Sequence, residues 1–252
     1  AIPWNPALDL LLSHRSVRAY RPDPLPEGTL EALVAAAQSA ATSSNMQAWS
    51  VVAVTDPDSK RRLAAVAGGQ RHVEQCPLLL VFLADLSRHA RLAERTGRPL
   101  EGLPFLETFL VAALDAGLAA QYAVVAAESL GLGTVYIGAL RNDVEAVAEE
   151  LGLPPGAVAV FGLCVGHAAP DGGAVKPRLP QAAVLHHGRY DPEADMLALP
   201  GYDAALEAFS RGQERSPYTW TQRAMARWGT LRAMAGRDRL REALERLGFP
   251  LR

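Results

Sequence analysis

The sequence predicts a mixed fold of strands and helices that lacks regular βαβ alternation. Short apolar runs at 48–55, 77–84 and 157–166 have the composition of strands, and helical segments separate them irregularly. No GxGxxG motif accompanies the first of these strands, which argues against a Rossmann dinucleotide domain. A chain of 252 residues fits one large domain or two small ones.

Bulk composition narrows the classes of partner. The chain is 49% hydrophobic and 21% charged, as in ordinary globular proteins, and its net charge is −2. Nucleic acids and membrane surfaces call for a pronounced basic excess, so we expect neither as a partner. The amino-terminal residues have no charged start and no long apolar core, unlike a secretory signal. We therefore expect a cytoplasmic protein.

The cysteines and histidines give little sign of a metal site. Cys76 and Cys164 both lie in apolar runs, which favours buried free thiols over a disulfide or a redox pair. The chain has six histidines but neither HExxH nor CxxC. We expect no metal.

The first half of the chain predicts three helices and two strands. Residues 6–15 form a short amphipathic helix, which the prolines at 22, 24 and 26 keep from continuing. Residues 27–40 form a second helix, and TSSNMQAW ends it with residues that favour turns and caps. The strand at 48–55 precedes a capped helix that ends at Gly68-Gly69, and the run at 77–84 is apolar enough to be buried on both faces.

The longest apolar element spans residues 103–131. Asp115 and Glu128 interrupt it, so we expect a core helix and not a membrane span. Its small residues would let another backbone approach closely. They allow either a self-association surface or packing within the chain. These small residues are Ala112, Ala113, Ala116, Gly117, Ala119 and Ala120.

The second half continues with a strand at 133–137, a helix capped by Asn142 that runs to Leu151, and the strand at 157–166. A basic loop with two prolines (VKPRLP) and a strand at 183–187 follow. The composition then becomes more charged, with helices near 193–209, 219–234 and 237–247. We expect residues 1–192 to form the core and residues 193–252 to form a helical extension of the same domain.

Two clusters carry positive charge. His14-Arg15-Ser16-Val17-Arg18 places cationic and hydroxyl donors at a helix end, where they suit a phosphate; the alternative is a solvated basic turn. Lys176-Pro177-Arg178 adds two cations around a proline that fixes φ. Together the clusters would enclose one dianion.

A third group of residues is polar but neutral. The segments 42–47 and 68–70 offer amides and hydroxyls, which suit the edge of a flat heterocycle, and residues 136–140 add an apolar strand end. The alternative is that each loop satisfies its own backbone. The chain shows no GxSxG elbow, no P-loop and no spaced pair of carboxylates, so a cofactor is expected to carry the chemistry.

These residues occur in strings that resemble the nitroreductase family, in its oxygen-insensitive, NADPH-preferring nitroreductase/flavin reductase branch. The resemblance spans nearly the whole chain, and the strings follow the order of that branch: SHRSVRAY, the SS-x-x-Q region, GGQRHV, AAESLGLGTVYIGALRN, FGLCVGHAAP, KPRLP and SRGQERSPYTW.

The resemblance implies an α+β fold with a nitroreductase-like central sheet flanked by helices. It also implies an interlocked homodimer with a helical C-terminal excursion and FMN at the interface. Lys176 resembles the cation near flavin N1 and O2, where it would stabilise the charge of the reduced ring. The implied FMN contacts are His14, Arg15, Ser16, Arg18, Thr42, Ser43, Gln47, Gln70, Tyr136, Ile137, Gly138, Ala139, Leu140, Lys176 and Arg178.

The resemblance also implies a site for NADPH and the acceptor, formed by Arg18, Ser44, Asn45, Arg141, Arg211 and Arg215. Three positions depart from the branch. Arg215 falls about one residue early, Gly138-Ala139 replaces Gly-Gly, and Asn45 replaces a bulkier residue and would open the pocket.

The implied reaction is ping-pong transfer of two electrons from NADPH through FMN to nitroaromatic or quinone acceptors. The flavin N5 atom carries the hydride, so no side chain is assigned as catalytic. A dedicated NADPH-dependent flavin reductase and a flavin-binding protein with little turnover are the alternatives.

Overall fold

The computed structural model describes residues 3–170, 173–213 and 216–252. The chain separates into two compact units, the first from Ala1–Gly172 together with Gly236–Arg252, and the second from Gly173–Ala235. The boundary expected at residue 193 stays a prediction.

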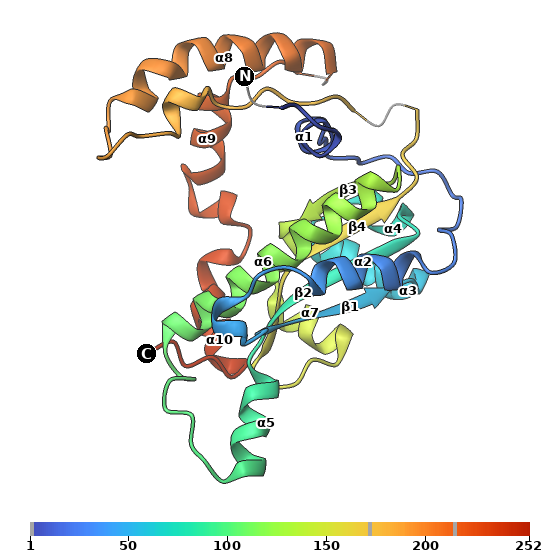
Figure 1. Ribbon diagram of the computed structural model, residues 1–252, viewed down its shortest axis with the longest axis vertical. Coiled ribbons are helices and arrows are strands. Elements are labelled where there is room, and N and C mark those ends of the chain that lie inside the picture. Colours follow the sequence, from blue (N-terminus) through green and yellow to red (C-terminus); the bar gives the residue numbers. More distant parts are fainter. Residues whose placement is uncertain (1–2, 171–172, 214–215) are drawn as a thin grey trace. The chain divides into compact units, whose positions relative to one another are not determined.

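A four-stranded sheet forms the centre of the first unit (Figure 1). Its strands lie in the order β1-β2-β4-β3, and every neighbouring pair is antiparallel. Antiparallel neighbours need no crossover helix, which explains the absence of βαβ alternation. The strands confirm the four predicted in this part of the chain: β1 Trp49–Val54, β2 Leu78–Asp85, β3 Gly133–Ile137 and β4 Ala157–Gly166.

One face of the sheet is covered by α2 (Thr29–Gln38) and α6 (Leu106–Ser129) (Figure 1). Strand β2 is buried along its whole length, so alternate side chains enter the layers on its two faces. On this face Leu80 and Phe82 pack against Leu33 of α2 and the alanines of α6. The predicted burial of this strand on both faces is confirmed.

The other face is covered by α3 (Pro57–Val66), α4 (Arg71–Gln75) and α7 (Val144–Leu151). Cys76 and Cys164 lie in this layer, and both are free, buried thiols, as the sequence predicts. The remaining helices of the first unit are α1 (Pro6–Leu12), α5 (Ser87–Thr96) and α10 (Leu240–Arg246).

The last residues of the chain belong to the first unit. Leu244 and Phe249 are buried with Leu86 and Val144 in a third cluster at one end of the sheet. The amide of Arg252 donates to the Pro104 carbonyl at 2.9 Å, next to the start of α6. This packing holds α10 and the carboxyl terminus against the core.

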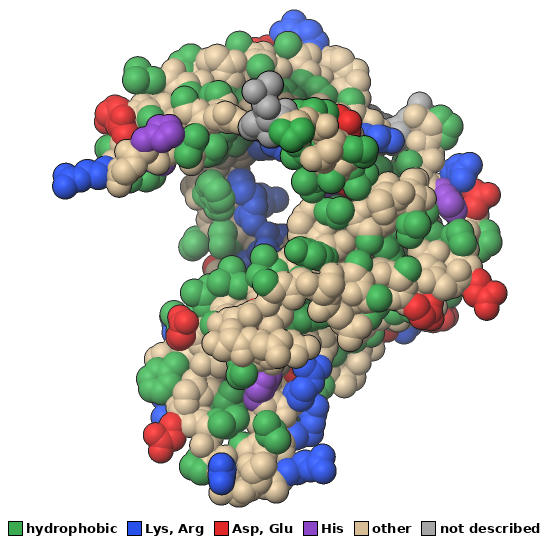
Figure 2. Space-filling model, viewed as in Figure 1, with side chains coloured by type: hydrophobic (Ala, Val, Ile, Leu, Met, Phe, Trp, Pro, Cys, Tyr) green, Lys and Arg blue, Asp and Glu red, His purple; other side chains and the backbone are tan. Residues whose placement is uncertain are grey.

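Helix α6 is long and apolar enough, by length and composition, to cross a membrane. Its small residues instead pack within the chain, with Ala116, Ala119 and Ala120 fully buried. Large apolar side chains stand at every fourth position on its outer side, each about half exposed, and apolar side chains are visible along this helix in Figure 2. We call these residues the α6 stripe: Leu106, Leu110, Leu114, Leu118 and Tyr122.

Two local predictions are wrong. Asp143, and not Asn142, caps α7, because its side chain accepts from the Ala146 amide at 3.0 Å. The Asn142 amide group donates instead to the Val66 carbonyl. The strand predicted at 183–187 is absent from the second unit as described. The Gln181 carbonyl there accepts from the amides of residues 184 and 185 and closes a turn.

The second unit contains α8 (Ala194–Gln213) and α9 (Trp220–Trp228), followed by a 3₁₀ turn at Leu231–Met234. Thr219 and Gln222 form a capping box that starts α9. The helix predicted at 193–209 is confirmed and runs further, whereas the one predicted at 219–234 ends at Gly229.

Candidate functional site

The segment that carries the first basic cluster lies along strand β3. The Val17 amide donates to the Thr134 carbonyl at 2.8 Å, and Ser16 forms a parallel bridge with Thr134. His14 is half-buried, and its Nδ1 lies 2.6 Å from Oε1 of Glu128. Because a carboxylate accepts, Nδ1 carries the proton, and Nε2 is the ring atom left for another partner.

Glu128 is a residue of the candidate site that the sequence did not single out. It lies near the carboxyl end of α6, holds His14 and also accepts from the Thr134 hydroxyl at 3.4 Å. Its signal in the sequence is a carboxylate in a mostly apolar helix, where it also argues against a membrane span. The structure shows that this acid orients the histidine of the basic cluster.

Arg15 and Arg18 are exposed in the first unit. Burial, and secondly the charge of Arg18, lower the pKa of His72 on α4. Its Nε2 is buried without a hydrogen-bond partner in the part of the chain that the structure describes. Gln70, just before His72, donates to the Ala67 carbonyl. A buried nitrogen without a hydrogen-bond partner in the described chain fits a polar ligand at this place.

The end of β3 turns only one large side chain outward. Tyr136 is 37% exposed and donates to Oε1 of Gln121 at 3.3 Å, whereas Ile137 and Leu140 are buried in the core. Ile137 and Leu140 therefore offer a ligand only their backbone. Burial, and secondly Glu128, raise the pKa of Tyr136 to about 12, so this strand end lies in the same region as the basic cluster.

Arg141 lies just beyond this strand end. A Cβ added at Gly138 would stand 3.3 Å from Nη2 of Arg141, so the guanidinium packs close to Gly138. The same guanidinium donates to the Val160 carbonyl of β4. Arg141 is therefore held beside the end of β3 by Gly138 and by β4.

The neutral polar loop at 42–48 has a strained backbone. Ser44, Asn45 and Gln47 have φ of 48°, 58° and 50°. A left-handed conformation costs a residue other than glycine roughly 1–2 kcal/mol, although asparagine tolerates it better. Residues in such conformations persist where their surroundings fix them, and they gather at ligand sites.

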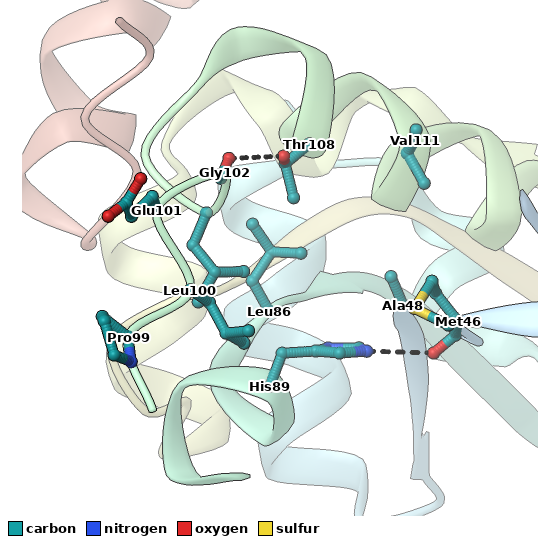
Figure 3. Close-up of a pocket in the computed structure, with 11 residues that line it drawn as sticks. Met46, Ala48, Leu86, His89, Pro99, Leu100, Glu101, Gly102, Thr108 and Val111 are labelled. Atoms are coloured by element: carbon teal, nitrogen blue, oxygen red, sulfur yellow. Dashed lines mark hydrogen bonds between the residues drawn. The ribbon is translucent and has the colours of Figure 1, made fainter. Parts of the chain in front are cut away.

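Side chains from α5 and α6 bind this loop. Asp115 accepts from the amides of Ser43 at 3.0 Å and Ala48 at 3.1 Å. Arg88 donates to the Gln47 carbonyl at 2.9 Å, and His89 donates to the Met46 carbonyl at 3.0 Å (Figure 3). Behind the loop lies an apolar cavity of about 460 Å³, bordered by Met46, Ala48, Leu86, His89, Leu100 and Val111 (Figure 3).

The structure does not bring this loop to the basic cluster within one chain. Glu128 binds His14, whereas Asp115 binds the loop, and the two acids are 13 residues apart on α6. At 1.5 Å per residue, that is about 20 Å along the helix axis. The basic cluster and the loop at 42–48, which both carry predicted flavin residues, thus lie at separate places on α6.

The remaining predicted residues belong to the second unit and are described apart. Lys176 donates to the Tyr218 hydroxyl at 2.9 Å, and Arg178 donates to the Lys176 carbonyl at 2.8 Å. Arg223 stacks 4.0 Å from the centre of the Tyr218 ring. Arg211 pairs with Glu207 on α8 at 2.8 Å. The predicted Arg215 lies outside the described residues.

Comparison with known proteins places the chain in a family. Residues 11–167 match the Nitroreductase family, and residues 176–252 match the Nitroreductase family C-terminal domain. An FMN reductase (NADPH) of Bacillus subtilis is 40% identical over 226 residues, which cover 88% of this chain and 90% of the relative. An oxygen-insensitive NADPH nitroreductase of Salmonella typhimurium is 39% identical over 219 residues, with coverage of 86% and 88%.

A solved structure agrees with these relatives. The structure of B. megaterium NfrA2 is 38% identical in sequence and superposes with a TM-score of 0.92. The match covers 99% of this chain and 100% of the NfrA2 chain. This likeness confirms the α+β fold and the central sheet with flanking helices. Taken with the matches along both parts of the sequence, it shows that this chain belongs to the nitroreductase family.

Proposed function

We propose that this protein works as a homodimer that holds FMN, takes hydride from NADPH and reduces nitroaromatic or quinone compounds. The observation that carries the proposal is the division of the predicted flavin residues into two halves about 20 Å apart on α6. A second copy of the chain would bring its loop to the basic cluster of the first. The relatives named as NADPH-dependent FMN reductase and nitroreductase support the same reaction.

The side chains present fit FMN. Exposed Arg15 and Arg18, with His14 oriented by Glu128, suit the phosphate, because charge-assisted bonds to a dianion are the strong ones. The unpartnered His72 nitrogen lies on the helix that Gln70 precedes. When bound, FMN supplies a ring that accepts hydride and donates two electrons.

The α6 stripe supports the homodimer. Five large apolar side chains at four-residue spacing, each about half exposed, make a continuous apolar ridge that winds slowly around α6, because four residues exceed one helical turn of 3.6. Contiguous exposed apolar surface marks sites of association. An interface on this face would lie on the helix that carries both Glu128 and Asp115, where it can join the two halves of the site.

The other predicted residues would position the two substrates. Lys176 would face flavin N1 and O2, and its bond to Tyr218 would limit its movement. Arg211 and Arg215 would bind the 2′-phosphate of NADPH. Ser44 and Asn45 would line the acceptor pocket, where Asn45 leaves more room than a bulkier residue. The cytoplasmic location stays a prediction.

An absorbance spectrum of the purified protein tests this function. Flavin bands that bleach on anaerobic addition of NADPH and return on addition of nitrofurazone would establish both half-reactions. A colourless protein that gains no flavin spectrum after incubation with FMN would contradict the cofactor. Faster turnover of free FMN than of nitrofurazone, with weak FMN retention, would favour the flavin reductase that the Bacillus relative's name suggests.

A further inference from the structure

Asp115 is an ionisable side chain in the middle of an apolar helix. It is 1% exposed, and it stands among buried alanines of α6 such as Ala112 and Ala116. Removing a carboxylate from water is costly unless hydrogen bonds replace the lost water. One oxygen accepts from the Ser43 amide and the other from the Ala48 amide. Both oxygens of this buried charge therefore bind the two ends of one loop.

The loop between those ends requires such support. Ser44, Asn45 and Gln47 have left-handed backbone conformations, which favour glycine. The apolar cavity of about 460 Å³ borders the loop at Met46 and Ala48, so these two side chains are not packed on that side (Figure 3). The hydrogen bonds to the loop backbone must therefore supply much of the constraint.

Two side chains of α5 complete the support. His89 donates to the Met46 carbonyl, and Arg88 donates to the Gln47 carbonyl. Arg88 also donates to the Ser50 hydroxyl at 3.2 Å, and that hydroxyl donates to Asp85 at the end of β2 at 2.5 Å. The loop is thereby tied to the central sheet on one side and to α6 on the other.

We propose that Asp115 is a positioning residue for the electron acceptor. It fixes the two ends of the loop, so that Ser44 and Asn45 keep the orientation in which they meet the acceptor, and Arg88 and His89 act as secondary anchors. The inference rests on the proposed function, which places Ser44 and Asn45 in the acceptor pocket. Asp115 acts through the loop, because its own oxygens are bonded to loop amides.

The test compares Asp115→Asn with two control variants in the full-length, FMN-loaded protein. Asparagine keeps the size of aspartate but has one acceptor oxygen, and its NH₂ group would face a backbone donor. Glu107→Gln removes a carboxylate from an exposed position of the same helix, and Val124→Ala loosens the buried side of that helix. Neither position is bonded to the loop.

Two quantities are measured for each variant. We expect hydrogen exchange at the amides of residues 43–48 to speed up at least tenfold in Asp115→Asn and to stay near wild type in both controls. We expect kcat/KM for nitrofurazone to fall at least fivefold in Asp115→Asn. The kcat/KM for NADPH should fall less than that for nitrofurazone, because Arg211 is also proposed to hold the nucleotide.

The outcomes separate the inference from the function on which it rests. Unchanged exchange in Asp115→Asn overturns the anchor, and faster exchange with unchanged nitrofurazone kinetics overturns the positioning role. An equal kinetic loss in Val124→Ala would assign the effect to general destabilisation. If the wild-type protein reduces no nitrofurazone, the proposed function fails, while the exchange result still reports on Asp115.

A second variant guards against a failure to fold. Arg88 is exposed, so Arg88→Gln removes one loop bond without disturbing the core. We expect it to speed exchange at residues 43–48 at least threefold and to lower nitrofurazone kcat/KM in the same direction. No change in either quantity would count against the anchoring network.

Discussion

Leu114→Asp should separate the two chains and release FMN in the same step. Leu114 lies in the middle of the α6 stripe and is 58% exposed in the single chain. Full burial of a leucine side chain contributes about 1.5–3 kcal/mol, so covering its exposed part contributes roughly 1–1.5 kcal/mol in each copy. The variant loses this contribution twice, once in each chain of the dimer.

The new carboxylate adds a larger cost. An uncompensated charge in an apolar interface costs several kcal/mol per ion. The two effects together weaken the dimer by about 6 kcal/mol or more, which corresponds to roughly 10⁴-fold in the dissociation constant. Because the basic cluster and the loop of one chain lie about 20 Å apart on α6, the separated chain should hold FMN through only half of its contacts.

Sedimentation velocity and the ratio of flavin to protein absorbance would measure both effects in one sample. Leu92→Asp is the matched control, since Leu92 is 55% exposed on α5 and lies outside the stripe. A Leu114→Asp monomer that keeps a full complement of FMN would refute the assignment of the two halves to different chains. A variant that stays dimeric would refute the stripe as the interface.

Three further predictions concern charged side chains. Lys176→Ala should lower the FMN midpoint potential by about 30–60 mV, since one charge-assisted bond contributes about 1.5–3 kcal/mol; a spectroelectrochemical titration with an unchanged midpoint and bound FMN would remove that role. Replacing Arg211 and Arg215 with alanine should raise KM for NADPH far more than KM for NADH, and steady-state kinetics with an equal rise for both would contradict the 2′-phosphate assignment. Hydrogen bonds from Arg62 and a serine hydroxyl lower the pKa of Glu150 to about 2. A depressed carboxyl pKa stabilises the fold above the unfolded value near 4.3, and this contribution is lost as pH falls towards 2. Glu150→Gln should therefore narrow the difference in thermal stability between pH 5 and pH 2.5, and an unchanged difference would contradict the pairing.

The strands were predictable from the sequence because each is a short apolar run between turn signals. Strand β4 spans the predicted residues 157–166, and β2 is buried along its length as its composition requires. The prediction of a strand at 183–187 was wrong because an apolar segment forms a strand only when it pairs with another strand. Here the Gln181 carbonyl closes a turn instead. Helix α5 was missed because SRHARLAERT is mostly charged and polar, and no side-chain cap marks its start.

The site was predictable as a set of residue types but not as an arrangement. The clusters at 14–18 and 42–47 pointed to phosphate and heterocycle binding, yet nothing in the residues places them at separate positions on one helix. That separation depends on Glu128 and Asp115, which from the sequence served only to argue against a membrane span. Side chains that act through another residue leave little trace in a motif, because the motif contains only the residue that they hold.

The bonding of the loop at 42–48 bears on the two interpretations that the sequence left open. The loop satisfies part of its own backbone, since the Met46 amide donates to the Ser43 carbonyl at 2.8 Å and the Asn45 amide donates to the Thr42 carbonyl at 3.3 Å. A loop of serine and asparagine is expected to satisfy its own backbone through those side chains. Here side chains from outside satisfy the Ser43 and Ala48 amides and the Met46 and Gln47 carbonyls. Within the part of the chain that the structure describes, the hydroxyls of Ser43 and Ser44 make no hydrogen bond. An anchored backbone with uncommitted hydroxyls is expected of a loop that binds a ligand, and it argues against a loop that only closes a turn.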